Sequence, residues 1–192
     1  ILTQTQSDKM AKKAIVYLAD GFEEIEALAT VDVMRRAGME VTLVSINPSL
    51  EVTGAHGVKV VADVLMSDVD AAHAEWLVLP GGMPGATNLA ACEPLTSMLV
   101  AHNEAGGRIA AICASPAIVF APLGLLNGKN AVCYPGMEVG CCGVNWQSDM
   151  VVVDGNVVTG KGPAAACSFG FTIAAMSQGV DCAEEVARGM LL

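Results

Sequence analysis

The sequence contains few aromatic side chains and few positive charges. Aromatic residues make up 4% of the 192 residues, and 20 Asp and Glu residues outnumber 10 Lys and Arg residues, which gives a formal net charge of −10. An acidic surface disfavours contact with a phosphate backbone or an anionic membrane, so we expect no direct nucleic-acid binding and no membrane attachment. No apolar run approaches the ~20 residues that span a bilayer. The apolar segments therefore predict buried strands and helices.

Metal-binding patterns are also missing. The three histidines (His56, His73 and His102) have no ligand spacing, and none of the seven cysteines forms a CxxC or zinc-finger pattern. We therefore expect no metal site and, since no disulfide framework is apparent, a reduced cytoplasmic setting. The vicinal pair Cys141–Cys142 has two interpretations. The two thiols point in different directions on a loop, or they act together by oxidising or by binding a soft metal.

The length and the pattern of the chain favour one domain. The segment 1–9 (ILTQTQSDK) has no basic region followed by an apolar core, and it is interpreted as a tag remnant or leader stub. Residues 10–192 contain no linker, internal repeat or low-complexity tract. They are long enough to bury one sizeable core, so we expect a single domain over this range.

Strands and helices alternate along this domain. Short apolar runs predict buried strands at Ala14–Leu18, Glu40–Ser45, Trp76–Leu79 and Ile109–Ile112. Helical spacing is found at Glu23–Ala37, at Glu93–Ala105, from Gly162 to about Ser177, and at Asp181–Leu191, where we expect Asp181 to cap the helix. Short β pieces flank Gly54 and Gly57, and a hairpin is expected around Asp154–Gly155. This alternation predicts an α/β fold whose parallel sheet is covered on both faces.

The stretch Arg108–Ala117 (RIAAICASPA) carries the clearest chemical signal. An apolar strand ends abruptly at Cys113, and Pro116 opens a helix that should run to about Pro122. A thiol between strand and helix has the geometry of a nucleophile elbow, and a helix N-terminus favours the thiolate and a low pKa. The alternative is an ordinary buried cysteine. The turns Asp20–Gly21 and Gly81–Gly82 also follow predicted strands, which places them at the ligand-binding edge of the sheet.

Five motifs, in this order along the chain, resemble the ThiJ/PfpI superfamily, in the branch of the human parkinsonism-associated deglycase and its bacterial relatives. They are ADGFEEIEA at 19–27, VDVMRRAG at 31–38, VLPGGMPGATNL at 78–89, AAICASPA at 110–117 and TGKGPAAACSFG at 159–170. The resemblance implies a flavodoxin-like three-layer sandwich, with helices on both faces of a mostly parallel sheet, and a homodimer.

The resemblance also assigns roles to individual residues. Cys113 falls at the reactive cysteine, and Glu26 at the glutamate that touches its sulfur. Gly81, Gly82 and Ala114 fall at the backbone donors of the anion or oxyanion pocket. The residues alone would favour a solvated helix face for Glu26, beside Glu23 and Glu24, and only the resemblance separates it from these neighbours.

Three further positions each have two interpretations. Tyr134 stands where the human-type site has a histidine, so it either orients a substrate carbonyl or packs at a loop start. His56 stands where the human protein has an arginine near the pocket, the alternative being a surface loop histidine. Cys133 is either a second redox thiol or a buried small residue. Ala114 replaces the histidine that proteolytic relatives place after the cysteine, which disfavours an amidase or peptidase.

The function that the resemblance implies is a glyoxalase III or protein deglycase in carbonyl and oxidative stress defence. Cys113 would attack methylglyoxal, or its adduct on a protein or nucleotide, and Glu26 would move the proton, with lactate as product and no cofactor. The alternative is a thiol redox sensor or redox-linked chaperone with little turnover.

Overall fold

A computed structural model describes residues 12–192, and the expected tag or leader at 1–9 and the start of the domain at Met10 lie outside these residues. Seven strands form one sheet in the order β10-β11-β7-β6-β1-β2-β5. Their bounds are β1 (Lys13–Leu18), β2 (Glu40–Ser45), β5 (Val64–Leu65), β6 (Trp76–Leu79), β7 (Arg108–Ile112), β10 (Val151–Asp154) and β11 (Val157–Gly160). All neighbouring strands are parallel except the β10–β11 hairpin. The predicted mostly parallel sheet is confirmed.

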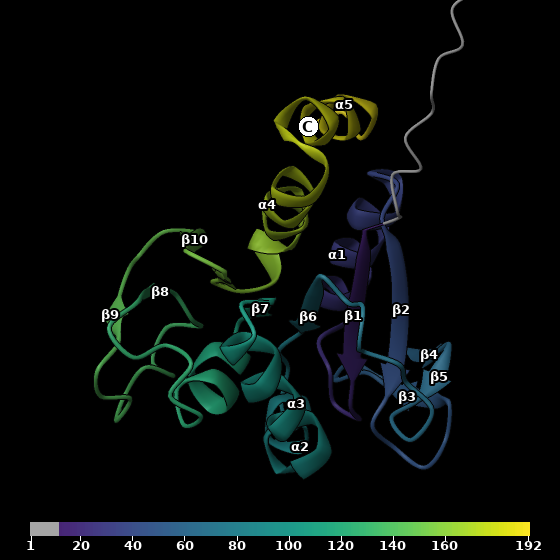
Figure 1. Cartoon of the computed structure of the whole chain (residues 1–192). Coiled ribbons are helices and arrows are strands. Elements are labelled where there is room, and N and C mark those ends of the chain that lie inside the picture. Colours follow the sequence, from purple (N-terminus) through teal and green to yellow (C-terminus); the bar gives the residue numbers. More distant parts are fainter. Residues whose placement is uncertain (1–11) are drawn as a thin grey trace, which may run out of the picture.

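Helices cover both faces of this sheet (Figure 1). One face packs against α1 (Glu24–Arg36), α4 (Ala166–Gln178) and α5 (Val180–Gly189), and the other against α2 (Gly85–Ala91), α3 (Glu93–Glu104) and a π-helical turn at Pro116–Phe120. Side chains alternate accordingly along β1: Val16 and Leu18 join the first core, whereas Ile15 and Tyr17 join the second. The three-layer α/β sandwich follows from strands that are apolar on both faces.

Two smaller β pairs lie outside the main sheet. β3 (Glu51–Thr53) and β4 (Lys59–Val61) form an antiparallel hairpin, as the glycines at 54 and 57 predicted. β8 (Asn130–Ala131) and β9 (Asn145–Trp146) form a short parallel pair that the sequence did not reveal. Each of these strands has only two residues, which is too short for a periodic pattern, so the pair depends on a contact between distant segments.

Two expectations about the helices need correction, and one helix was not predicted. The helix after Cys113 is a π-helical turn that ends at Phe120, where the bond from the Ala121 N–H to the Pro116 carbonyl spans five residues. The last helix begins at Val180 behind Gly179, and no side chain caps it, so the predicted Asp181 cap is wrong. The short helix α2 was not predicted, because its run of small residues has no clear apolar period.

The topology brings three chain turns to one edge of the sheet. β1, β6 and β7 are adjacent and parallel, so their carboxyl ends lie side by side. Asp20–Gly21, Gly81–Gly82 and Cys113 follow these three ends, as predicted. Within residues 12–192, every helix is too short or too polar to cross a membrane.

Candidate active site

Cys113 occupies a strained turn at the end of β7. Its φ is 66°, a conformation that side chains other than glycine rarely adopt. The strand hydrogen bonding continues to this residue, since the Cys113 N–H donates to the Gly160 carbonyl at 2.8 Å. The buried Ser115 hydroxyl donates to the Pro80 carbonyl and ties the elbow to the end of β6. The predicted nucleophile-elbow geometry is therefore present, and the thiol is 7% exposed.

Glu26 is held in the first turn of α1, facing the interior. The Glu23 carboxylate caps this helix by accepting the Glu26 N–H at 2.7 Å. Oε2 of Glu26 accepts the Gly81 N–H at 2.8 Å, and the residue is 1% exposed. Its other oxygen, Oε1, is buried with no hydrogen-bond partner of standard geometry among the described residues. The solvated-face alternative for Glu26 is therefore excluded.

The turn after β6 fits between these two side chains because it lacks side chains of its own. A Cβ on Gly81 would lie 2.6 Å from Cys113 Cβ and 2.8 Å from Glu26 Oε2. Gly82 adopts a φ of 87° and packs against the backbone at Gly21 and Glu23, where a Cβ has no room. Glycine at both positions thus lets backbone amides approach the thiol.

Cys113 and Glu26 control each other's protonation. Burial raises the pKa of Glu26 to about 7, although hydrogen bonds with Cys113 and the Gly81 N–H oppose this rise. Burial and the Glu26 carboxylate raise the pKa of the Cys113 thiol to about 12, against the opposing effect of the Gly82 and Ala114 N–H groups. The expected low-pKa thiol is therefore wrong for the resting site, because burial and, after it, the Glu26 carboxylate disfavour the thiolate.

The rim of the site contains a carboxylate that the sequence did not single out. Glu24 is buried, and its Oε1 accepts the N–H groups of His56 at 2.7 Å and Val58 at 3.4 Å. Its Oε2 lies 2.8 Å from Nδ1 of His56, and this hydrogen bond raises the pKa of the exposed imidazole. Glu24 thus fastens the β3–β4 loop to α1. His56 is a surface loop residue that contacts Glu24, and no bond links it to Cys113 or Glu26 within the described chain.

A backbone hydrogen bond holds the segment with Cys133 and Tyr134 against the elbow. The Tyr134 N–H donates to the Cys113 carbonyl at 2.8 Å, and the half-exposed ring lies against Gly162. Cys133 is buried, and its thiol donates to Oε2 of Glu138 at 3.8 Å. All seven cysteines are free thiols, Cys141 and Cys142 included.

One group of side chains has ligand atoms close enough to hold a metal. Glu23, Glu24 and His56 place one such atom each within 4.8 Å of the others. Both Glu24 oxygens already accept or share hydrogen bonds, and the N-terminal end of α1 disfavours a cation. These three side chains are therefore better explained as the contact that holds the β3–β4 loop to α1 than as a metal site.

Known proteins share the sequence pattern and the fold of this chain. The model of the DJ-1/PfpI family matches residues 12–176. This chain belongs to the DJ-1/PfpI family. DJ-1 homolog B of Arabidopsis thaliana is 37% identical over 183 residues, which cover 94% of this chain and 42% of the relative. The chain thus spans less than half the length of this plant protein.

Relatives of similar length exist as well. The glutathione-independent glyoxalase DJR-1.2 of Caenorhabditis elegans is 31% identical over 94% of this chain and 97% of the relative. The structure of oxidized DJ-1 from Toxoplasma gondii superimposes with a TM-score of 0.89 at 37% identity, covering 94% of this chain and 98% of the other. The DJ-1/PfpI fold therefore extends over nearly all of the chain.

Proposed function

We propose that this DJ-1/PfpI protein is a cysteine-dependent glyoxalase III or deglycase that converts methylglyoxal, free or as its adduct on a protein or nucleotide, to lactate. The observation that carries the proposal is the arrangement of Cys113 and Glu26 around Gly81, together with the N–H groups of Gly82 and Ala114, which lower the pKa of the Cys113 thiol. The glyoxalase activity named for the C. elegans relative supports the same reaction class.

The geometry supports a sequence of proton transfers through Glu26. Its carboxylate accepts the thiol proton as Cys113 attacks the aldehyde carbon, which forms a carbon–sulfur bond and an oxyanion. The N–H groups of Gly82 and Ala114 stabilise that oxyanion, which then takes the proton back from Glu26 and restores its carboxylate. Glu26 next moves a proton from the former aldehyde carbon to the neighbouring carbon, while the hydroxyl proton passes to the neighbouring oxygen, and a thioester results. Water hydrolyses the thioester to lactate and restores the thiol. No cofactor is needed, because methylglyoxal plus water equals lactic acid.

The test is lactate formation by the purified protein. We expect turnover by the parent, none by Cys113→Ala, and at least about a 10²-fold loss in Glu26→Gln, in the range of general acid–base catalysis. Cys142→Ala is the matched control, because this thiol is exposed on a loop and does not line the Cys113 site. No lactate from the parent, or equal lactate from Cys113→Ala, would refute the proposal.

A redox sensor or redox-linked chaperone is the second candidate. It is favoured by the T. gondii relative, whose structure is of an oxidized form, and by a carboxyl at hydrogen-bonding range of the sulfur. Mild peroxide followed by mass spectrometry separates the two candidates. Selective addition of two oxygens at Cys113 in a protein without turnover would favour the sensor. A peptidase is less well supported, since Ala114 stands where a histidine would be needed.

The assembly and compartment belong to the same proposal. Ile25 and Leu28 on α1 and Val61 on β4 are exposed apolar side chains that would be covered in a homodimer. Seven free thiols suit a reducing compartment such as the cytoplasm. Light scattering on the purified chain measures the mass, and a monomer at all concentrations would contradict the dimer.

A further inference from the structure

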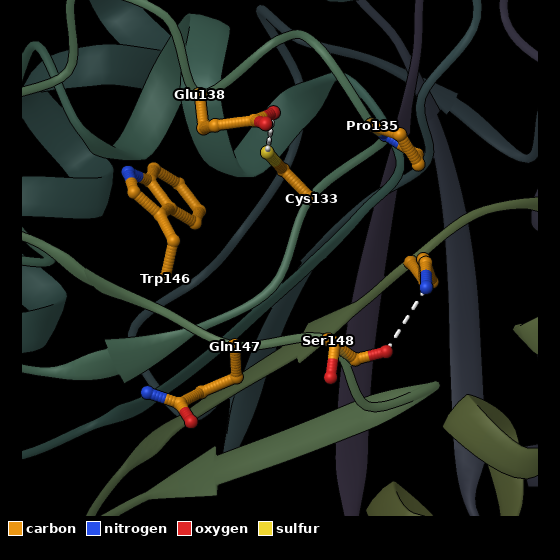
Figure 2. A pocket seen from close by; sticks show the side chains of 7 residues that line it. Cys133, Pro135, Glu138, Trp146, Gln147 and Ser148 are labelled. Carbon is orange, nitrogen blue, oxygen red and sulfur yellow. Dashed lines mark hydrogen bonds between the residues drawn. The ribbon is translucent and has the colours of Figure 1, made fainter.

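A second cavity lies on the other side of the segment that carries Tyr134. It has a volume of about 460 Å³ and is lined by Cys133, Pro135, Glu138, Trp146, Gln147, Ser148 and Lys161 (Figure 2). Tyr134 itself does not line it, although its N–H bonds to the Cys113 carbonyl. The Cys133 side chain lines this cavity, whereas neither Tyr134 nor Cys113 does. The cavity is thus separate from the Cys113 site.

The cavity has one positive and one negative lining residue that do not pair with each other. Nζ of Lys161 donates to the Ser148 carbonyl at 2.9 Å, and within residues 12–192 it reaches no carboxylate. Oε2 of Glu138 accepts the Gly136 N–H at 2.7 Å, and no Lys, Arg or His of the described chain forms an ion pair with this carboxylate. In Figure 2, Glu138 and Ser148 lie on opposite sides of the cavity. Each end therefore retains hydrogen-bonding capacity for a charged partner.

The wall between these two ends carries two apolar rings and a thiol. The Trp146 ring, the Pro135 ring and the Cys133 thiol line it (Figure 2). Burial and the Glu138 carboxylate raise the pKa of the Cys133 thiol to about 12, so the thiol adds no charge. Gln147 is held at its amide nitrogen by Asn130 and Asn145.

We propose that this cavity binds a small amino-acid-like zwitterion, whose carboxylate pairs with Lys161 at the Ser148 end and whose ammonium group pairs with Glu138. The apolar body of the ligand would pack against Trp146 and Pro135. Ligand pockets typically measure ~300–1,000 Å³, and this cavity lies within that range and offers both charged groups and apolar rings. A singly charged molecule would satisfy only one of the two ends, which predicts selection for the zwitterion.

L-Phenylalanine tests this proposal against two analogues that each lack one charge, 3-phenylpropionate and phenethylamine. The readout is the indole N–H signals of a ¹⁵N-labelled sample, because the chain has two tryptophans. Trp146 lines the cavity, whereas Trp76 is fully buried and bonds to Ser177, so Trp76 is an internal control. We expect L-phenylalanine, with L-leucine as a second amino acid, to shift the Trp146 signal alone. Each analogue should bind at least about tenfold more weakly.

Two substitutions test which residues pair with the carboxylate and the ammonium group of the ligand. Lys161→Met and Glu138→Gln should each weaken L-phenylalanine binding about tenfold or more, whereas Lys59→Met, on the distant β4, should have no effect. No Trp146 shift with either amino acid, equal binding of an analogue, or full binding by Lys161→Met would each overturn the proposal. The analogue comparison uses the parent protein, so it stands even if a variant does not fold. Lactate formation by the same samples tests the Cys113 site independently.

Discussion

Glu26→Gln is expected to change how the stability of the fold depends on pH. In the folded protein, burial raises the pKa of Glu26 from 4.5 to about 7. Between these two values, the unfolded chain releases the Glu26 proton while the folded chain keeps it. The contribution of the protonated carboxyl to stability is therefore complete below pH 4.5 and is lost as pH rises through about 7. At 1.36 kcal/mol per pH unit, the loss amounts to roughly 3 kcal/mol. A glutamine carries no titrating group, so the variant lacks this loss.

The measurement is urea unfolding of parent and variant at several pH values from 4.5 to 7.5, at one protein concentration. The difference in unfolding free energy between the two proteins cancels every group that titrates alike in both. We expect the parent to lose about 3 kcal/mol relative to Glu26→Gln as pH rises through this window. A difference that stays flat would mean that Glu26 titrates like an exposed carboxyl. A difference of opposite sign would mean that hydrogen bonds to Gly81 and Cys113 outweigh burial.

Three further changes probe the surroundings of the pair. Gly81→Ala should cost about 1–3 kcal/mol of stability and abolish most turnover, because its Cβ would lie 2.6 Å from Cys113 Cβ; parent-like urea curves would contradict this crowding. Glu24→Gln should lower the pKa of His56 towards that of a free imidazole, since the carboxylate at 2.8 Å raises it, and an unchanged imidazole NMR titration would disprove the link. Tyr134→Phe should alter stability by less than about 0.5 kcal/mol, because its hydroxyl bonds to no described residue; a larger loss in thermal unfolding would reveal a missed contact.

The sheet and the elbow could be predicted because local sequence determines them. β6 and β7 are short apolar runs that end at glycines or at a cysteine followed by small residues. A parallel sheet buried on both faces requires such runs, and the elbow requires small neighbours. The positions of Cys113, Gly81 and Gly82 at one edge then follow from the topology alone.

Other features depend on contacts between distant segments. Glu23 and Glu24 resemble an exposed acidic helix start, yet both are buried, because the helix cap and the β3–β4 loop use their oxygens. The cavity at Cys133 forms where the β8–β9 region meets the residue after β11. Contacts between distant segments leave no periodic pattern in the sequence. The sequence therefore could not reveal the contact between Glu24 and the β3–β4 loop, or the cavity.

The protonation state of the Cys113–Glu26 pair bears on the choice between enzyme and sensor. Burial raises the pKa of the Cys113 thiol and of the Glu26 carboxyl, and the Glu26 carboxylate raises the pKa of the thiol further, so the thiolate is disfavoured at neutral pH. The resting thiol is then neutral, and a neutral thiol reacts slowly with peroxide. A docked aldehyde changes this balance, because Glu26 can take the thiol proton while the N–H groups of Gly82 and Ala114 stabilise the new oxyanion. The thiolate character of Cys113 thus arises with the substrate in place, which favours turnover of a carbonyl compound over oxidation of the free protein.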